Sequence, residues 1–175
     1  MDLRNVTEFI KDISKYIIVI IIVLLLFIFV VGLQQVVGPS MSPNLEEGNI
    51  IIVNKLIYRL KDISRNDVIV LSQDEKYMIK RVVGLPGEYV EYKDNYVFIN
   101  GVKYKEKFID ENIKTEDFSI KDIGYDVIPN DMYLVLGDNR ENSLDSRSYG
   151  LVSKNQVIGK AWIRLWPLDS IEIIK

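Results

Sequence analysis

Two serines, Ser40 and Ser42, lie between two prolines in the segment 38–43, which reads GPSMSP. Proline fixes the backbone φ angle and glycine permits a close approach of the chain, so this loop can present the Ser40 hydroxyl in a fixed position. The same residue types are typical of an ordinary linker, and the segment on its own favours the linker. A nucleophilic role for Ser40 therefore needs a base from elsewhere in the chain.

The chain contains no His and no Cys. This excludes serine triads that use histidine, cysteine nucleophiles, disulfides, and metal sites built from imidazole or thiolate. A general base near neutral pH must then be a carboxylate or a lysine whose pKa is lowered by burial. We expect no metal and no cofactor.

One lysine is set in a run of apolar residues. The segment 77–83 reads YMIKRVV, a predicted strand whose apolar neighbours can enclose Lys80, with Arg81 on the opposite face. Lowering a lysine pKa from ~10.4 to ~7 to 8 costs on the order of 4 kcal/mol, which burial in a folded domain can supply. A surface lysine is the alternative, and Lys55 and Lys160 also lie in apolar runs, so periodicity does not choose among the three.

A dense polar segment, GDNRENSLDSR at 137–147, follows an apolar run. Its spacing invites a calcium interpretation, but a calcium loop needs Asp or Asn at its third position and Gly at its sixth, where Arg140 and Ser143 stand. A self-contained polar loop with internal ion pairs is the better structural alternative. The acidic residues and arginines available for such pairs are Asp138, Asp145, Arg140 and Arg147.

The segments between these polar residues predict the elements that hold them. Short runs rich in β-branched and aromatic residues alternate with turn formers, a pattern typical of strands. Hairpin turns are predicted at Asn100-Gly101 and at 93–95 (KDN), because these residue types tolerate positive φ. The predicted fold is mainly β, a β-sheet or β-barrel-like domain with a small inserted β subdomain at about 88–129. The runs read NIIIVNKLIY, DVIVLS, YMIKRVVGL, EYVEY, YVFINGVKY, MYLVL and VIGKAWIRLW.

The N-terminal part of the chain has a different composition. The 18 residues 16–33 (YIIVIIIVLLLFIFVVGL) carry no charge, and at ~1.5 Å per residue they nearly span a ~30 Å hydrocarbon core. A cleaved signal peptide is disfavoured, since small residues normally follow its shorter apolar region, whereas Gln34 and Gln35 follow here. A buried core helix is disfavoured because the segment is apolar on all sides. We expect a transmembrane helix as an anchor at 16–34.

Cations are distributed asymmetrically around this segment. The next cation after it is Lys55. Positive charge is retained on the cytoplasmic side, so we expect residues 1–15 in the cytoplasm and an extracytoplasmic domain at 35–175, with a single pass through the cell membrane. Membrane lipid is then a predicted partner. Nucleic acid is not, because the net charge is -3 and no basic stretch is present. The cations before the segment are Arg4, Lys11 and Lys15.

The polar segments occur together in the order found in one protein family. The chain resembles the bacterial type I signal peptidases, whose membrane span is followed by a Ser-Met-x-Pro box, a Tyr-x-Ile-Lys-Arg box that ends in Gly-Leu-Pro-Gly, and a Gly-Asp-Asn-Arg-x-Asn-Ser-x-Asp-Ser-Arg box. The match extends from the anchor to about Val152, and the single span resembles the compact forms of Gram-positive bacteria. The corresponding segments here are SMSP at 40–43, YMIKR at 77–81, GLPG at 84–87 and GDNRENSLDSR at 137–147.

The resemblance implies a role for each polar residue. Ser40 becomes the nucleophile, Lys80 the neutral general base, and Ser143 the residue that hydrogen-bonds and orients the lysine amine. A serine/lysine pair suits a chain without histidine. The resemblance also implies supporting charged residues, a structural Asp145 and Arg147 ion pair and a loop support from Asp138.

One position departs from the family pattern. Some members carry a hydroxyl residue two positions before the nucleophile as an oxyanion donor, whereas this chain has Gly38. The backbone N–H groups of Ser40 and Gly38 remain as candidate donors, and one lost donor costs about 100- to 1,000-fold in rate. The family preference for small residues one and three places before the cut implies shallow apolar pockets. The candidate walls are Met41, Ile79 and Val82.

The implied activity is removal of signal peptides from secretory preproteins by a membrane-bound serine endopeptidase. Self-cleaving repressors resemble this arrangement, but they carry a DNA-binding domain where this chain has its apolar segment. The branch of signal peptidases that uses histidine is excluded. A tethered binding module or an inactive relative is the alternative from another functional class, and a Ser40→Ala variant separates the two.

Overall fold

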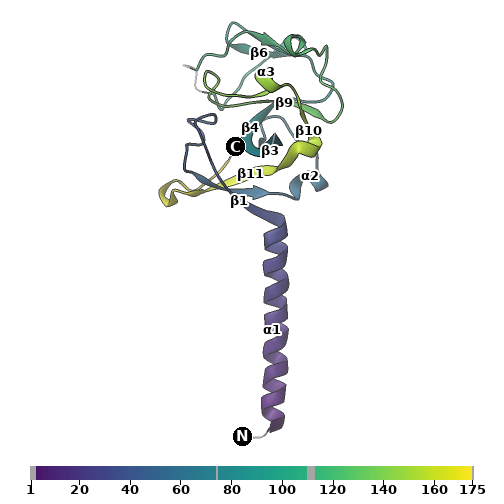
Figure 1. Ribbon diagram of the computed structural model, residues 1–175, viewed down its shortest axis with the longest axis vertical. Helices are drawn as coiled ribbons and strands as arrows, with labels where there is room; N and C mark the ends of the chain where they lie inside the picture. The colour runs from purple at the N-terminus through teal and green to yellow at the C-terminus, as the bar shows by residue number, and fades with distance from the viewer. Residues whose placement is uncertain (1–2, 74, 110–112, 175) are drawn as a thin grey trace.

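The computed structural model (Figure 1) describes the backbone of residues 3–73, 75–109 and 113–174. A long N-terminal helix projects from a β-rich body, and a second, smaller sheet lies at the end of the body far from this helix (Figure 1). Parts of the segments predicted above lie outside this description: residues 1–2, 74, 110–112 and 175, and the side chains of 3–7, 10 and 26–28.

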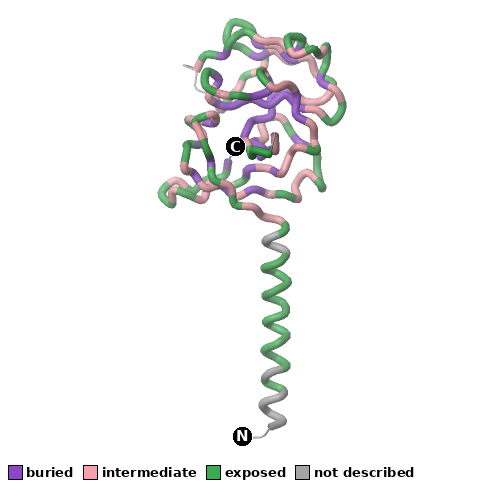
Figure 2. The backbone as a smooth tube through the Cα atoms, viewed as in Figure 1, coloured by how far each residue is buried: buried purple, intermediate pink, exposed green. Residues whose placement is uncertain are grey.

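The projecting helix is α1, Leu3–Val30, and its described side chains are exposed along most of its length (Figure 2). Strand β1, Val31–Gln35, follows directly. The predicted anchor at 16–34 therefore has its last residues in a strand, because β1 pairs along its whole length with β2 instead of continuing the helix. Within the residues that the structure describes, no helix combines the length and the apolar character needed to cross a membrane.

The body is mainly β, as the sequence predicts. In the described residues, eight strands form one antiparallel sheet in the order β1-β2-β11-β3-β4-β9-β10, with β12 paired to β11. The strands after β1 are β2 Ile50–Asn54, β3 Val68–Gln73, β4 Lys76–Gly84, β9 Met132–Leu136, β10 Val152–Ser153, β11 Val157–Trp166 and β12 Glu172–Ile173.

The second sheet is inserted between β4 and β9 and has the order β7-β6-β5-β8 in the described residues. Both predicted hairpin turns are confirmed, because Lys93 pairs with Tyr96 across one turn and Ile99 pairs with Val102 across the other. Asn100 has a φ of 52°, which asparagine tolerates at small cost. The strands are β5 Val90–Lys93, β6 Tyr96–Ile99, β7 Val102–Tyr104 and β8 Phe118–Ser119.

Short helical turns connect the strands. One of them bears on the site, because the Asp145 side chain accepts a hydrogen bond from the Arg147 backbone N–H and so caps the turn that follows it. The described short helices are α2 Ile57–Leu60, α3 Ser146–Tyr149, η1 Ile120–Ile123, η2 Lys154–Gln156 and η3 Leu168–Ser170.

Strand β4 is buried on both faces from Ile79 to its end at Gly84. Its apolar residues Ile79, Val82 and Val83 belong to three separate buried clusters. Each fully buried aliphatic side chain of this kind contributes roughly 1.5–3 kcal/mol to folding. A polar side chain on this half of β4 is therefore removed from water whichever face it occupies.

Candidate active site

Lys80 and Ser40 meet at the edge of the main sheet. The Lys80 Nζ atom lies 2.9 Å from the Ser40 Oγ atom, and the two residues are 40 positions apart in the chain. Lys80 is only 3% exposed, because it stands in the buried half of β4. A protonated amine donates a hydrogen bond at this distance, whereas a neutral amine can accept the hydroxyl proton.

Burial controls the protonation of this amine. It lowers the pKa of the Lys80 ammonium from 10.5 to about 8, and the charges of Asp145 and Asp138 oppose the shift only in part. A substantial fraction of the amine is therefore neutral at mildly alkaline pH, as a general base requires.

The loop that carries Ser40 is held from two sides. Met41 is buried, so the loop is fixed to the main core immediately after the serine. On the other side, the Asn139 backbone N–H donates to the Ser40 carbonyl oxygen at 3.1 Å, and the Asn139 side chain donates to the Pro39 carbonyl oxygen at 3.2 Å. The polar segment 137–147 thus positions the serine directly.

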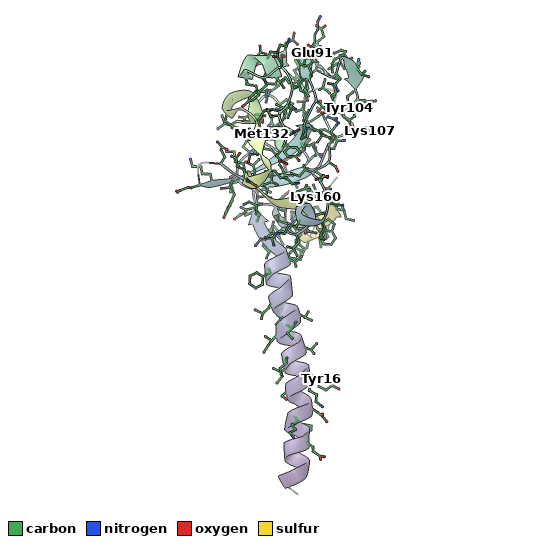
Figure 3. The ribbon with its side chains drawn as sticks, turned by 90° about the vertical axis from the view of Figure 1, so that its right-hand side faces the viewer. Tyr16, Glu91, Tyr104, Lys107, Met132 and Lys160 are labelled. Atoms are coloured by element: carbon green, nitrogen blue, oxygen red, sulfur yellow. The ribbon has the colours of Figure 1, made fainter. Side chains whose placement is uncertain are left out.

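The two rival lysines have other surroundings. Lys160 forms an ion pair with Asp67 and lies near the end of the body from which α1 projects (Figure 3). Lys55 is exposed. Of the three lysines that the sequence left open, Lys80 is the one that hydrogen-bonds to Ser40.

Asp145 is fully buried beneath the site and binds Arg147. Its carboxylate accepts hydrogen bonds from the Arg147 Nε at 2.9 Å, the Arg147 Nη2 at 2.8 Å and the Gly137 N–H at 3.1 Å. Burial raises the pKa of the Asp145 carboxyl, but the hydrogen bonds and charge of Arg147 and the Gly137 N–H lower it, and the net shift is downward. The carboxylate is therefore ionised near neutral pH.

Ser143 differs from the expectation. Its Oγ atom is buried and makes no hydrogen bond of normal geometry within the described residues, so the expected hydrogen bond to Lys80 is not present. The Lys80 amine is directed at Ser40 instead. Ser143 packs against Gly137 so closely that a Cβ atom on Gly137 would lie 2.2 Å from the Ser143 Oγ and 2.4 Å from the Ser40 carbonyl oxygen. Glycine is required there because three segments of chain meet.

Asp138 has a partner that sequence reasoning did not find. It is fully buried and forms a bidentate pair with Arg81, at 2.7 Å from Nε to Oδ1 and 2.6 Å from Nη2 to Oδ2. The Asn44 side chain also donates to Asp138, at 2.9 Å. Arg81 stands next to Lys80 on β4, so one strand supplies both the amine at Ser40 and the anchor of the loop 137–147. The 57 positions between Arg81 and Asp138 leave no local signal for this pair.

Gly38 has a φ of +78°, and a Cβ atom added to it would meet nothing within 4 Å. The glycine is thus explained by backbone conformation rather than by crowding, since a side chain costs free energy at this φ.

A cavity of about 220 Å³ opens beside Ser40 and Lys80. Two of the candidate pocket walls, Met41 and Ile79, line it. The third, Val82, does not, because it is fully buried in a different apolar cluster. The remaining lining residues are Gln34, Gln35, Val36, Val37, Tyr77, Met78 and Leu144.

A larger cavity of about 500 Å³ lies against the second sheet and contains none of the predicted site residues. In the described ranges, no group of three or more acidic side chains is arranged to hold a metal ion. The cavity beside Ser40 is the one that both Ser40 and Lys80 line.

Comparison with known proteins finds similar chains. The family described as signal peptidase, peptidase S26, matches residues 7–166. Signal peptidase I of Bacillus caldolyticus is 42% identical over 150 residues, covering 80% of this chain and 82% of that protein. Signal peptidase IB of Staphylococcus aureus strain Mu50 is 37% identical over 158 residues, covering 82% of each chain.

A solved structure is also similar. The crystal structure of a signal peptidase I from Enterococcus faecalis V583 has 36% sequence identity to this chain and a TM-score of 0.53. The match covers 57% of this chain and 97% of the Enterococcus chain.

Proposed function

The chain belongs to the peptidase S26 family of signal peptidases, and we propose on that basis that it removes signal peptides from exported preproteins with Ser40 as nucleophile and Lys80 as general base. As a member of this family it is a serine peptidase, a hydrolase. The observation that carries the residue assignment is the 2.9 Å distance between the Lys80 Nζ and the Ser40 Oγ.

The reaction begins with attack of the Ser40 oxygen on the carbonyl carbon of the scissile peptide bond. The neutral Lys80 amine takes the hydroxyl proton as the new C–O bond forms. The carbonyl oxygen becomes an oxyanion, for which the backbone N–H groups of Ser40 and Gly38 are the proposed donors. Lys80, now an ammonium, gives its proton to the leaving amine, the C–N bond breaks, and an acyl ester remains on Ser40.

Water completes the cycle. The neutral Lys80 amine takes a proton from a water molecule, and the water oxygen attacks the ester carbonyl. The C–O bond to Ser40 then breaks, and the serine oxygen recovers its proton from Lys80. The low pKa of Lys80, about 8, favours this repeated exchange because the amine must be both a good proton acceptor and a good donor.

The substrate is proposed to bind as an added strand. Strand β9 pairs with β4 from Arg81 onward, so in the described residues the stretch 76–80 pairs with β3 alone. Strand β1 likewise pairs with β2 alone there. These two edges border the cavity at Ser40, and an extended peptide can use their backbone groups for hydrogen bonds. Met41 and Ile79 would then contact its small side chains.

The proposal also includes a membrane anchor at 16–34, with residues 1–15 in the cytoplasm and the catalytic domain, 35–175, outside. It rests on the 18 uncharged residues 16–33 and on the cations that precede them. An anchor would confine the enzyme to the surface where its substrates emerge and raise their effective concentration. Extraction of cell membranes at alkaline pH tests it: the full chain should stay with the membrane, and a variant lacking residues 1–30 should not.

Cleavage of a precursor with an Ala-x-Ala signal sequence, in detergent, tests the catalytic assignment. Wild type should cut it, and Ser40→Ala and Lys80→Ala should not, whereas Lys55→Ala should retain activity because Lys55 is exposed. A Ser40→Ala variant that still cuts would show that another residue is the nucleophile. Full activity of Lys80→Ala at pH 8 would transfer the base to Lys55 or Lys160. Precursor binding without cleavage by wild type would indicate a binding protein.

A further inference from the structure

Three arginines contact the inserted segment that contains the second sheet. Each comes from the main-sheet side and meets an aromatic residue of the inserted segment. We name this set the arginine seam: Arg65 with Glu88 and Tyr104, Arg81 with Phe108, and Arg140 with Glu106 and Tyr92. Arg140 is the member that belongs to the loop 137–147, which contacts Ser40.

Arg140 and Glu106 form the most complete pair of the seam. The Arg140 Nη2 lies 2.6 Å from the Glu106 Oε1, and the Nη1 lies 3.0 Å from the Oε2. The Tyr92 hydroxyl donates to Glu106 at 2.9 Å and accepts from Arg140 at 2.9 Å. The side-chain exposures are 0% for Arg140 and 11% for Glu106. Figure 3 labels Tyr104 and Lys107, which flank Glu106 in the sequence, between Glu91 at the far end of the body and Lys160 near α1.

The Arg140 side chain also binds the catalytic loop. Its Nε donates to the Gly137 carbonyl oxygen at 3.0 Å, so the guanidinium joins the second sheet to the start of the loop. The neighbouring residue, Asn139, donates its backbone N–H to the Ser40 carbonyl oxygen at 3.1 Å. A continuous path of bonds therefore runs from Glu106 through Arg140 and its loop to the backbone of Ser40.

We propose that Glu106 and Arg140 are positioning residues for the nucleophile, and that the inserted second sheet serves catalysis by holding the serine loop at Lys80 through this ion pair. The inference rests on the proposed function of Ser40 and Lys80. Without the Glu106 carboxylate, the buried guanidinium loses the partner that completes its hydrogen bonds. Its Nε then no longer holds Gly137, and the turn that contacts Ser40 shifts.

The seam supplies a matched control. The pair of Arg65 with Glu88 joins the same two sheets and is also shielded, with side-chain exposures of 18% and 17%. Besides binding each other, the Arg65 side chain donates to the Val83 carbonyl oxygen and the Glu88 carboxylate accepts from the Leu85 N–H. Neither side chain has a described hydrogen bond to the loop 137–147. Glu106→Gln and Glu88→Gln therefore make the same chemical change at the same interface. Glu106 is connected through Arg140 to the loop that contacts Ser40, whereas Glu88 is not.

The experiment measures precursor cleavage by the full-length chain in detergent, together with thermal unfolding. Glu106→Gln should lower kcat by about 10- to 100-fold and change KM by less than about two-fold, because a shift of about 1 Å at reacting groups has that effect. The pH midpoint of the remaining activity should stay at the wild-type value, since the burial of Lys80 is unchanged. Glu88→Gln should lower the unfolding temperature similarly, with kcat within about two-fold of wild type.

Further variants keep the proposal testable if Glu106→Gln does not fold. Tyr92→Phe keeps the ring and removes the hydroxyl that bridges the pair, and should lower kcat by about three-fold with KM unchanged. The Glu106→Gln/Arg140→Gln double variant should lose no more activity than Arg140→Gln alone, because the two act as a unit. Equal kcat values for Glu106→Gln and Glu88→Gln, or wild-type kcat in a folded Tyr92→Phe, would overturn the inference.

Wild type and Ser40→Ala in the same assay separate this inference from the proposed function. Cleavage by wild type that is lost in Ser40→Ala, with Glu106→Gln as active as Glu88→Gln, would refute the positioning role and leave the proposed function standing. A precursor that wild type does not cut would refute both.

Discussion

Lys80 and Arg81 are adjacent on β4, with exposures of 3% and 1%, but their surroundings differ. Arg81 forms a bidentate ion pair with Asp138. Lys80 hydrogen-bonds to the neutral Ser40 hydroxyl, and none of the ion pairs among the described residues involves it. One face of the strand thus holds a charge with its counter-charge, and the other holds an amine without one.

The difference shows how a single buried strand serves two purposes. A buried cation with a carboxylate partner stays charged and can join distant segments, as Arg81 joins β4 to the loop 137–147. A buried amine without such a partner loses part of its proton affinity, and burial lowers the pKa of Lys80 to about 8. The first arrangement joins two segments of the chain, and the second gives an amine with a lowered pKa, the property that the proposed base needs.

Lys80→Met should produce the largest effect and separates the two purposes. The variant removes the proposed base, so cleavage of the precursor should fall by about 10²- to 10⁴-fold. Stability should rise, because the shift from 10.5 to about 8 corresponds to a cost of about 3 kcal/mol for the charged amine at pH 7. Urea unfolding of the variant and of wild type measures the difference.

The sign of this effect depends on pH. The unfolded chain binds the Lys80 proton more tightly than the folded chain, so wild-type stability rises between about pH 8 and pH 10.5. The advantage of Lys80→Met should be full below pH 8 and should vanish as pH rises through that window. Lys55→Met, at an exposed position, is the control. A variant less stable than wild type at pH 7 would contradict the cost assigned to the buried amine.

Asp138→Asn should produce the next largest effect, on the charged face of β4. The variant removes the carboxylate charge that pairs with the buried Arg81 guanidinium, and breaking a buried ion pair destabilises a protein by about 3–5 kcal/mol. The control is Asp62→Asn. Asp62 forms an ion pair with Lys154, and its side chain is 92% exposed. The unfolding free energy of this control variant should change by less than about 1 kcal/mol. Equal losses of unfolding free energy in Asp138→Asn and Asp62→Asn would contradict the expected difference between buried and exposed ion pairs.

Asp145→Asn tests the link between the two faces through the pH dependence of activity, where the expected change is the smallest of the three. Activity of wild type should rise with pH with a midpoint near 8, where burial places the pKa of Lys80. The charge of Asp145 raises that pKa, so its neutral replacement should move the midpoint to lower pH. The pH dependence of kcat/KM between pH 6 and 10, with Asp62→Asn as control, measures this shift. A midpoint that moves upward would contradict the assigned direction.

Local chemistry in the sequence was sufficient for both hairpin turns and for most of the longer strands. The short strands β8, β10 and β12 lie in none of the predicted runs, and Ile57 and Tyr58 of one run belong to α2. The turn at Asn100 and Gly101 was predicted because these residue types accept positive φ, and both have it. The end of α1 was not predictable in the same way, because Val31–Gln35 begins with apolar residues and ends in two glutamines, a composition compatible with the end of a helix in lipid and with an edge strand. Pairing with β2 decides that it is a strand.

The site shows the same division. The absence of His and Cys left a carboxylate or a lysine as the possible general base. The family resemblance pointed to Ser40 and Lys80, whereas by pattern alone several lysines in apolar runs were equivalent. Ser143 was expected at Lys80 and has no such bond, and Glu106 carried no local signal. Residue types and turn propensities act over a few positions, so the sequence determined the available chemistry and local elements. Strand register and sheet packing bring together residues such as Arg140 and Glu106, 34 positions apart. Only the tertiary structure therefore decided which lysine is buried beside Ser40 without an ion pair among the described residues.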